Sequence, residues 1–353
     1  MDAKALLSEL VEKGVADIFI ITGRPLSYKR GTSIEPLNDR VLLPADTEEI
    51  ISQIYEMAEN RSMATIIESG DDDFSFAIKG VSRFRVNTYK QRGSLAAVIR
   101  VVAFDLPDPH ALRIPQSVLD LTELRRGLVL ITGPAGSGKT TTLACLIDLI
   151  NNTRNVHVIT LENPIEFLHR HRESLISQRE VSIDTVSYAT ALRAALRESP
   201  DVILIGELRD PETISIALTA AETGHLVLST LHTVGAVNTV DRLVDSFRAE
   251  QQAQVRMQLS MSLQSVISQQ LLPATDGSMI PAFEIMHCNN AIRNLIREGR
   301  THQMSAVINT SAAEGMIGMD ASLLHLFKEG MISAQDMITH ALAPETLAKQ
   351  AGL

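Results

Sequence analysis

The chain has 353 residues, of which 45% are hydrophobic and 21% charged, and its formal net charge is −10. This length predicts about two globular domains. The acidic balance disfavours a dedicated nucleic-acid-binding protein, so no nucleic-acid partner is expected. No apolar run approaches the roughly 18 residues of a membrane-spanning helix. The two cysteines, Cys145 and Cys288, are too few for a zinc site or a disulfide framework, so we expect a reduced, cytoplasmic protein.

Residues 1–105 predict a small α+β domain. Helical periodicity, turn residues and, from Phe74 onward, an alternation of apolar and polar residues define its elements. In chain order these are a helix at 4–13, a strand at 17–22, a hairpin with turns at Gly23, Pro25 and Gly31, a helix capped by Asp46, strands around 74–78 and 84–86, and a strand at 94–103.

Arg85 and Arg100 lie on adjacent predicted strands of this domain. Arg83 and Arg85 alternate with the apolar Phe84 and Val86, which places both arginines on the face away from the core. Arginines on such a face are usually only solvated. The functional alternative is contact with a triphosphate bound elsewhere, because a guanidinium stabilises charge on transferring phosphoryl oxygens.

Pro107, Pro109 and Pro115 predict a linker at 106–117. Beyond it, near-continuous apolar strands alternate with helices, which predicts an α/β domain at 118–270 with a parallel sheet covered on both faces. Strands are expected at 128–132, 157–161, 202–205 and 226–230, and helices from Thr140, at 187–197, from Asp210 and from Ala236. From Ala249 the pattern is helical, with a strand predicted only at 280–286, so 271–353 is expected to be a mainly helical C-terminal region.

A phosphate-binding loop follows the first of these α/β strands. Its residues fit G-x-x-x-x-G-K-[ST] and are Gly133, Pro134, Ala135, Gly136, Ser137, Gly138, Lys139, Thr140 and Thr141. The glycines let backbone N–H groups face nucleotide phosphates, and Lys139 adds a positive charge near the β- and γ-phosphates. The Thr140 hydroxyl is a Mg²⁺ ligand in this motif, and the following helix directs its positive end at the phosphates. A Gly-rich turn without a ligand is the alternative, but the strand before and the helix after favour the phosphate loop.

Polar side chains follow the other strands at the edge where such sheets bind ligands. Glu162 and Glu166 follow the second strand, Glu207 follows the third, and His232 follows the fourth. Glu207 is placed to hold Mg²⁺ directly or through water, and Glu166 or Glu162 to orient or deprotonate the attacking water. His232 is a candidate sensor of the γ-phosphate, although a histidine in this place often only terminates a strand.

These motifs resemble those of the secretion ATPase superfamily and, within it, the type IV pilus retraction ATPases of the PilT type. Besides the phosphate loop, residues 160–167 resemble that family's Asp box, 197–213 its Walker B region and 223–233 its His box. Residues 291–298, Ala-Ile-Arg-Asn-Leu-Ile-Arg-Glu, resemble the signature of the retraction branch. By helical spacing alone, this last segment is a surface helix with Arg293 and Arg297 on its outer side.

The resemblance implies a PAS-like N-terminal domain, a RecA-like P-loop ATPase core and a helical tail, assembled as a homohexamer that binds ATP and Mg²⁺ between subunits. It implies that Glu166 is catalytic, that Arg85 and Arg100 act on a neighbouring subunit's nucleotide, and that His225, in the His box, belongs with the nucleotide-binding residues. The implied activity is ATP hydrolysis that powers pilus retraction and twitching motility. The implied partners are an inner-membrane pilus platform protein, at its cytoplasmic face, and a paralogous retraction ATPase.

Asn163 departs from the family, which has Asp in this place of the Asp box. An accessory or regulatory subunit with weak hydrolysis is therefore an alternative. A pilus extension or type II secretion ATPase is a further alternative, although those proteins usually carry a tetracysteine zinc insertion. A hexameric nucleic-acid translocase with the same core is disfavoured by the acidic charge.

Overall fold

The structure is a computed structural model that describes residues 2–30, 33–59, 61–102 and 106–353. The chain divides into two compact units. The first unit comprises Met1–Asp105 and Glu166–Leu168, and the second unit comprises Leu106–Ile165 and His169–Leu353. Residue Gly31 of the predicted hairpin, and Ala103 at the end of a predicted strand, lie outside the described residues.

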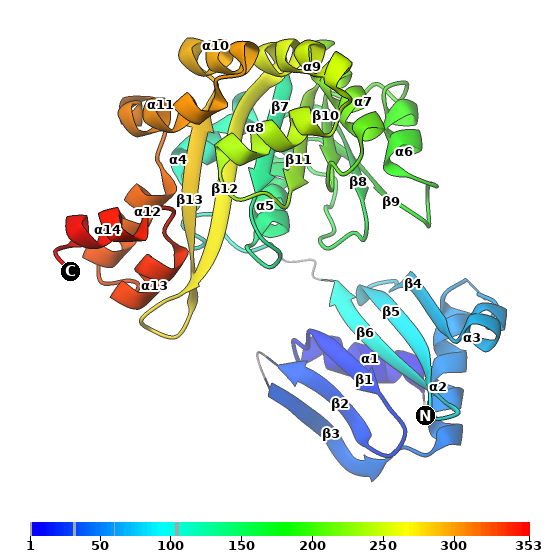
Figure 1. The fold of residues 1–353 in the computed structure, drawn as a ribbon. Coiled ribbons are helices and arrows are strands. Elements are labelled where there is room, and N and C mark those ends of the chain that lie inside the picture. Colours follow the sequence, from blue (N-terminus) through cyan, green and yellow to red (C-terminus); the bar gives the residue numbers. More distant parts are fainter. Residues whose placement is uncertain (1, 31–32, 60, 103–105) are drawn as a thin grey trace. The chain divides into compact units, whose positions relative to one another are not determined.

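Within its described residues, the first unit is a six-stranded antiparallel sheet in the order β3-β2-β1-β6-β5-β4. The strands are β1 Asp17–Ile20, β2 Pro25–Arg30, β3 Ser33–Val41, β4 Asp71–Ile78, β5 Ser82–Gln91 and β6 Ser94–Val102, and the helices are α1 Ala3–Glu12, α2 Pro44–Met57 and α3 Ala64–Ser69. The helices lie against one face of the sheet (Figure 1). Apolar residues of the helices and of this sheet face share one core. Burial along β4 and β5 alternates residue by residue, which confirms the predicted α+β unit and its period-two strands.

The predicted role of Asp46 as a helix cap is wrong in detail. Helix α2 begins at Pro44, and Leu43 is its N-cap residue. The Asp46 carboxylate, in the first turn, accepts the backbone N–H of Leu43 at 2.8 Å and an ion pair from Arg40 at 2.6 Å. The helix start moved because proline fits the first helical position, where its missing N–H costs nothing.

In its described residues the second unit forms a seven-stranded sheet in the order β13-β12-β7-β11-β10-β8-β9. The strands are β7 Gly127–Thr132, β8 His157–Glu162, β9 Leu175–Glu180, β10 Val202–Ile205, β11 Leu226–Leu231, β12 Leu263–Pro273 and β13 Met279–His287. All neighbours pair in parallel except β12 and β13, which form an antiparallel hairpin. The α/β fold with a mostly parallel sheet is confirmed.

Strands β9 and β12 were not predicted, and the expectation of helix without clear strands after Ala249 is wrong for β12. The boundary expected at residue 270 falls inside this strand. Polar residues interrupt β12 at Ser265, Ser268, Gln269 and Gln270, yet all four are buried. The chain accepts them because tertiary partners satisfy their polar atoms, a condition that local sequence does not reveal.

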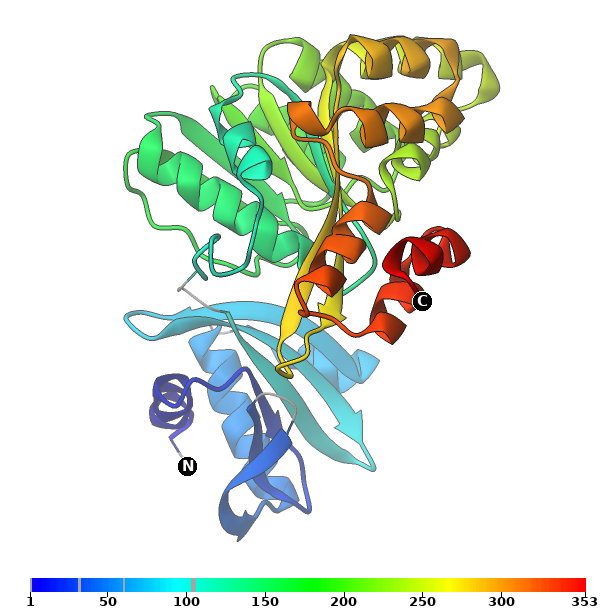
Figure 2. The same cartoon turned by 90° about the vertical axis from the view of Figure 1, so that its left-hand side faces the viewer.

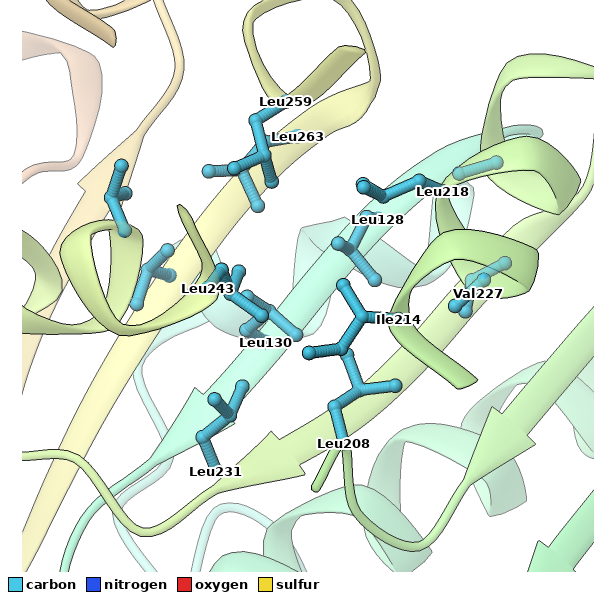
Figure 3. Packing of buried hydrophobic residues seen from close by; sticks show 14 of the residues in the cluster. Leu128, Leu130, Leu208, Ile214, Leu218, Val227, Leu231, Leu243, Leu259 and Leu263 are labelled. Carbon is cyan, nitrogen blue, oxygen red and sulfur yellow. The ribbon is translucent and has the colours of Figure 1, made fainter. Parts of the chain in front are cut away.

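Helices cover both faces of this sheet. One face packs against α6 Tyr188–Ala195, α7 Pro211–Glu222, α8 Ala236–Asp245, α9 Ala249–Ser262, α10 Asn290–Glu298 and α11 Met304–Thr310. Figure 3 shows this core, with Leu128 and Leu130 of β7 facing Ile214 and Leu218 of α7. The other face packs against α4 Gln116–Leu119 and α5 Lys139–Thr153. Each fully buried Leu or Ile contributes about 1.5–3 kcal/mol relative to an exposed one, so the double cover stabilises the sheet strongly.

The C-terminal helices pack against the long β12–β13 hairpin. Helices α12 Met319–Lys328, α13 Ala334–His340 and α14 Pro344–Ala351 lie beside the hairpin (Figure 2). They share an apolar cluster with Leu272 and Ile280 of the hairpin. The helical character expected for the C-terminal region is confirmed, with β13 as its strand. In the described residues, no helix is both long and apolar enough to cross a membrane.

Helix α10 holds the retraction-type segment and differs from its predicted outer face. Ile292 and Ile296 are buried, as expected. Arg293, however, is half-buried and donates to the backbone oxygens of Ser260 (2.8 Å) and Met261 (3.1 Å) at the end of α9. It therefore serves as a C-terminal cap for α9, because those carbonyls have no partner inside their own helix.

Candidate functional site

The phosphate loop connects the buried strand β7 to helix α5. Gly133, Gly136 and Gly138 have φ angles of 139°, 77° and 87°, which glycine adopts without the steric cost that other residues meet. A Cβ atom on Gly133 would clash with the backbone oxygen of Gln269 in β12 and with the hydroxyl of Ser137. Glycine is therefore required here by both conformation and space, and the loop lies tightly against β12.

The polar groups of the loop fit a bound polyphosphate. Lys139 is buried, and its ammonium donates to the backbone oxygens of Gly133 (2.9 Å) and Pro134 (2.7 Å). The Ser137 hydroxyl is buried and has no hydrogen-bond partner among the described residues. A buried donor and a buried ammonium at the N-terminus of a helix are the groups that phosphate oxygens need. Thr140 and Thr141 are half-buried on the first turn of α5.

A cavity of ≈ 530 Å³ opens beside the loop. On one side it is lined by Gly138, Thr141, Thr142 and Gln269, and on the other by a largely apolar wall. That wall includes Leu112, Ile114, Leu271, Ile280 and Met331. The volume of the cavity is within the range of small-molecule sites, and an apolar wall next to a phosphate loop suits a nucleoside. Ile114 shows that part of the predicted linker at 106–117 packs into the second unit.

Glu207 lies at the carboxyl edge of the sheet, directly after β10. Its side chain is 13% exposed, and one carboxylate oxygen is 2.7 Å from Arg209 Nε. The other carboxylate oxygen is 3.5 Å from His232 Nε2, after β11. The parallel register places the ends of β7, β11 and β10 along one edge, with Thr132 opposite Leu231. The structure therefore brings Glu207 and His232 together at the edge that carries the phosphate loop.

Glu162, the last residue of β8, is more enclosed than Glu207. Its Oε1 atom accepts hydrogen bonds from Thr160 Oγ1 at 2.7 Å and from Gln178 Nε2 at 3.2 Å. Burial, followed by the charges of Glu207 and Glu162, raises the pKa of the Tyr188 phenol, so Tyr188 stays protonated in this acidic corner. The two neutral donors, Thr160 and Gln178, hold the Glu162 carboxylate in a fixed position. A fixed carboxylate suits the orientation of water better than proton transfer.

His225 lies at the other edge of the sheet from the phosphate loop, so its assignment to the nucleotide-binding residues stays a prediction. It precedes β11, and its ring Nδ1 lies 2.9 Å from the backbone oxygen of Ala220. Its neighbour Leu226 pairs with Gly127, at the start of β7, whereas the phosphate loop follows the end of β7. A six-residue strand separates the two ends by roughly 17–20 Å.

Arg85, Arg100 and Glu166 lie in the first unit, and their relation to the phosphate loop stays a prediction. Arg85 and Arg100 pair directly across β5 and β6. Arg85 forms a bidentate contact with Asp73, with a closest approach of 2.7 Å, and Arg100 Nε lies 2.9 Å from Asp17. Two like charges side by side are unfavourable unless carboxylates flank them, as they do here. Glu166 is exposed.

Three features of the site were not predicted from the sequence: Gln269 of β12, Tyr188 of α6 and the apolar wall of the cavity. Gln269 was missed because the region after Ala249 was predicted to be helical, so strand β12 was not recognised. Tyr188 starts a helix that was predicted, but nothing in its spacing indicates two carboxylates nearby. The cavity wall combines segments that are far apart in the chain, such as Arg113 with Met331 at a separation of 218 residues, so only the folded chain assembles it.

A family model described as "Type II/IV secretion system protein" matches residues 2–340. The chain belongs to this family. It is 43% identical, over 98% of its length and 99% of the relative's, to "Type IV pilus retractation ATPase PilT" of Pseudomonas aeruginosa. It is 46% identical to "Twitching motility protein" of Neisseria gonorrhoeae, over 88% of this chain and 83% of that one. "Type IV pilus ATPase PilU" of Pseudomonas aeruginosa is 36% identical over 97% and 89% of the two chains.

Solved structures of this family share the fold. A crystal structure of the pilus retraction motor PilT with bound ADP superposes with a TM-score of 0.91 at 43% identity, covering 99% of both chains. The ATPase DotB of Legionella pneumophila gives a TM-score of 0.77 at 29% identity, covering 95% of this chain and 94% of that one. The resemblance to the pilus retraction branch of the family, inferred from motifs, is thus confirmed along the full chain.

Proposed function

We propose that this protein is a Mg²⁺-dependent ATPase that powers the retraction of type IV pili, and with it twitching motility. The observation that carries the proposal is a complete phosphate loop beside a nucleoside-sized cavity, with Glu207 and His232 on the same sheet edge. The likeness to PilT extends over both units of the chain and supports retraction in particular.

The residues of the second unit have distinct roles in this reaction. Backbone N–H groups of the loop and the Lys139 ammonium bind the phosphates. The described residues contain no cluster of three or more His, Cys, Asp or Glu side chains that could hold a metal ion by themselves. Mg²⁺ would instead be held by the Thr140 hydroxyl, by Glu207 and by ATP itself, and it supplies neutralisation of phosphate charge. His232 reports the state of the γ-phosphate.

The remaining roles depend on assembly. We assign Glu166 to orienting or deprotonating the attacking water, and Arg85 and Arg100 to the nucleotide of a neighbouring subunit. The chain acts in this proposal as a homohexamer at the cytoplasmic face of the inner membrane, against the pilus platform protein and alongside a paralogous retraction ATPase. The paired arginines on one sheet face support this role, because they offer two adjacent guanidinium groups to an anion.

ATP turnover by site variants tests the chemistry. Lys139→Ala and Glu207→Gln are expected to lower kcat on the order of 10²-fold or more, since each removes charge stabilisation next to the transferring phosphoryl group. Glu212→Gln is the matched control, because Glu212 is an exposed carboxylate on α7. Normal Mg²⁺-dependent turnover in both site variants would refute the assignment.

Deletion of the gene followed by counting of surface pili tests the biological role. Retraction predicts an excess of pili that do not retract, together with loss of twitching. Loss of pili would instead assign the protein to pilus extension.

Asn163 favours a second candidate, an accessory subunit that binds ATP but turns it over slowly. It is exposed in the loop after β8, where an aspartate would add a negative charge near the metal site. Slow wild-type turnover that rises at least tenfold in Asn163→Asp would support the accessory role. Brisk wild-type turnover would exclude it.

A further inference from the structure

Gln269 belongs to strand β12 and lies against the phosphate loop. The side chain is 4% exposed, and its backbone oxygen occupies the space that a Cβ atom on Gly133 would need. Its side-chain Nε2 atom is 2.8 Å from the position of a Cβ atom on Gly138. One residue therefore contacts both ends of the glycine-rich turn, Gly133 through its backbone and Gly138 through its amide.

The orientation of the Gln269 amide is fixed by Thr142. The Thr142 hydroxyl donates to Gln269 Oε1 at 2.8 Å, and both side chains are buried. Because the oxygen is used in this bond, the NH₂ group points to Gly138 and to the cavity that Gln269 lines with Gly138 and Thr141. An amide nitrogen has two N–H donors and no acceptor, so it is suited to an oxygen-rich ligand.

We propose that Gln269 is a nucleotide-positioning residue that donates from Nε2 to a phosphate oxygen held at the Gly138 end of the loop. The inference rests on the proposed function, because it requires phosphates in this loop. A neutral donor that is already fixed by Thr142 adds a hydrogen bond without ordering a mobile side chain. The role also explains why a buried polar glutamine occupies a strand next to β7, where an apolar residue would pack at lower cost.

The next residue of the strand provides a matched control. Gln270 is also a buried glutamine, but successive side chains of a strand point to opposite faces. Its Nε2 donates to the backbone oxygen of His340, at the end of α13, at 3.3 Å. The same substitution at 269 and at 270 therefore changes the same chemistry on two different faces of β12.

The test is ADP affinity, measured by fluorescence titration, together with the melting temperature without nucleotide. Gln269→Glu keeps the acceptor for Thr142 and replaces the donor by a carboxylate oxygen that repels phosphate. We expect its Kd for ADP to rise at least tenfold, its KM for ATP to rise likewise and its kcat to stay within threefold. Gln270→Glu should lower the melting temperature and leave the Kd for ADP within twofold of wild type.

Gln269→Met guards against misfolding of the glutamate variant, because it keeps the length of the side chain without a charge. It should weaken ADP binding three- to tenfold. Unchanged ADP affinity in both Gln269 variants would overturn the proposal. Equal losses of affinity at positions 269 and 270 would also overturn it, since they would indicate general damage to β12. Lys139→Ala tests the phosphate site separately from the role of Gln269, because normal ADP binding in that variant would refute the phosphate site itself.

Discussion

The two sheets of this protein differ in how many of their faces are covered by helices. In the second unit, β7, β10 and β11 are buried along their whole length, with helices on both faces. In the first unit, β4 and β5 bury every second residue and expose the others to varying degrees. A sheet covered on both faces can offer polar chemistry only beyond its strand ends, whereas a sheet with an uncovered face can offer it along the strands.

The position of the charged residues follows from this difference. In the second unit, Glu207 and His232 come after strands β10 and β11. In the first unit, Arg85 and Arg100 lie within strands, side by side on the face that the helices leave uncovered. A row of charged side chains thus crosses the sheet, with Asp73 at one end, both arginines in the middle and Asp17 at the other end. The uncovered face is therefore the part of the first unit equipped to meet an anion.

The largest expected effect concerns the edge of the covered sheet. Gly133→Ala places a Cβ against the backbone oxygen of Gln269 at a φ of 139°, so the loop must move away from β12. We expect nucleotide binding to weaken at least 100-fold, measured by fluorescent ADP titration. Gly136→Ala is the control, because its Cβ would meet nothing within 4 Å and only backbone strain of about 1–2 kcal/mol applies. Normal ADP binding by Gly133→Ala would show that the covered sheet does not constrain its edge.

The uncovered sheet face of the first unit is tested by substituting, one at a time, the two residues of the ion pair between Arg85 and Asp73. Arg85→Ala and Asp73→Asn both break the exposed contact between these residues, which contributes about 0.2–1 kcal/mol, so thermal stability should change little in either. If Arg85 acts on a neighbouring subunit's nucleotide as proposed, only Arg85→Ala lowers kcat, by roughly 10²-fold or more in the assembled protein, because it alone removes the guanidinium assigned to the transferring phosphoryl group. Equal turnover in the two variants would make the arginine row a merely solvated surface.

The covered unit also encloses a titratable group, His169. Burial lowers the pKa of this imidazole to about 4, and its Nδ1 has no hydrogen-bond partner among the described residues. The unfolded chain, with a histidine pKa of about 6.5, binds the proton first. Stability from this group is therefore present above the unfolded pKa of about 6.5 and is lost progressively as the pH falls toward 4, with about 2 kcal/mol lost by pH 5. Urea unfolding at pH 7 and pH 5 measures this loss, which should shrink in His169→Phe but persist when the exposed His302 is changed to Phe.

The smallest expected effect concerns the helices that cover the sheet of the second unit. Arg293→Ala removes the donors to the last carbonyls of α9 and to Gln264 Oε1, and should destabilise the protein by about 1–2 kcal/mol. Arg297, on the same helix but exposed, provides the control, and Arg297→Ala should cost less than about 0.5 kcal/mol. Denaturant unfolding compares the two. A larger loss for Arg297 would contradict the assignment of Arg293 as the cap of α9.

Much of the fold follows from the sequence alone. The period of the apolar residues distinguishes the first unit, with its alternating strands, from the second, with its continuous ones, because a half-covered sheet and a fully covered sheet impose different patterns. Asp210 and Pro211 start α7 as predicted, with Asp210 accepting the backbone N–H of Thr213 at 2.8 Å. These signals are local, so a short window of sequence contains them.

The candidate site is divided in the same way. The phosphate loop is a continuous segment whose glycines, lysine and threonine have a meaning at fixed spacing, and Glu207 and His232 could be assigned to an edge as soon as their strands were identified. His225 was assigned to the nucleotide only through the resemblance of its segment to the His box, and that assignment stays a prediction. The structure places His225 before β11, at the other edge of the sheet.

The sequence by itself determined that this chain holds a triphosphate, since the loop that binds phosphate is one uninterrupted stretch of backbone. Only the tertiary structure decided what surrounds that loop. Gln269 reaches it from a strand 127 residues away from its partner Thr142, and the cavity wall comes from both ends of the second unit. Such contacts arise from the pairing of β12 with β7, which depends on the packing of the whole unit.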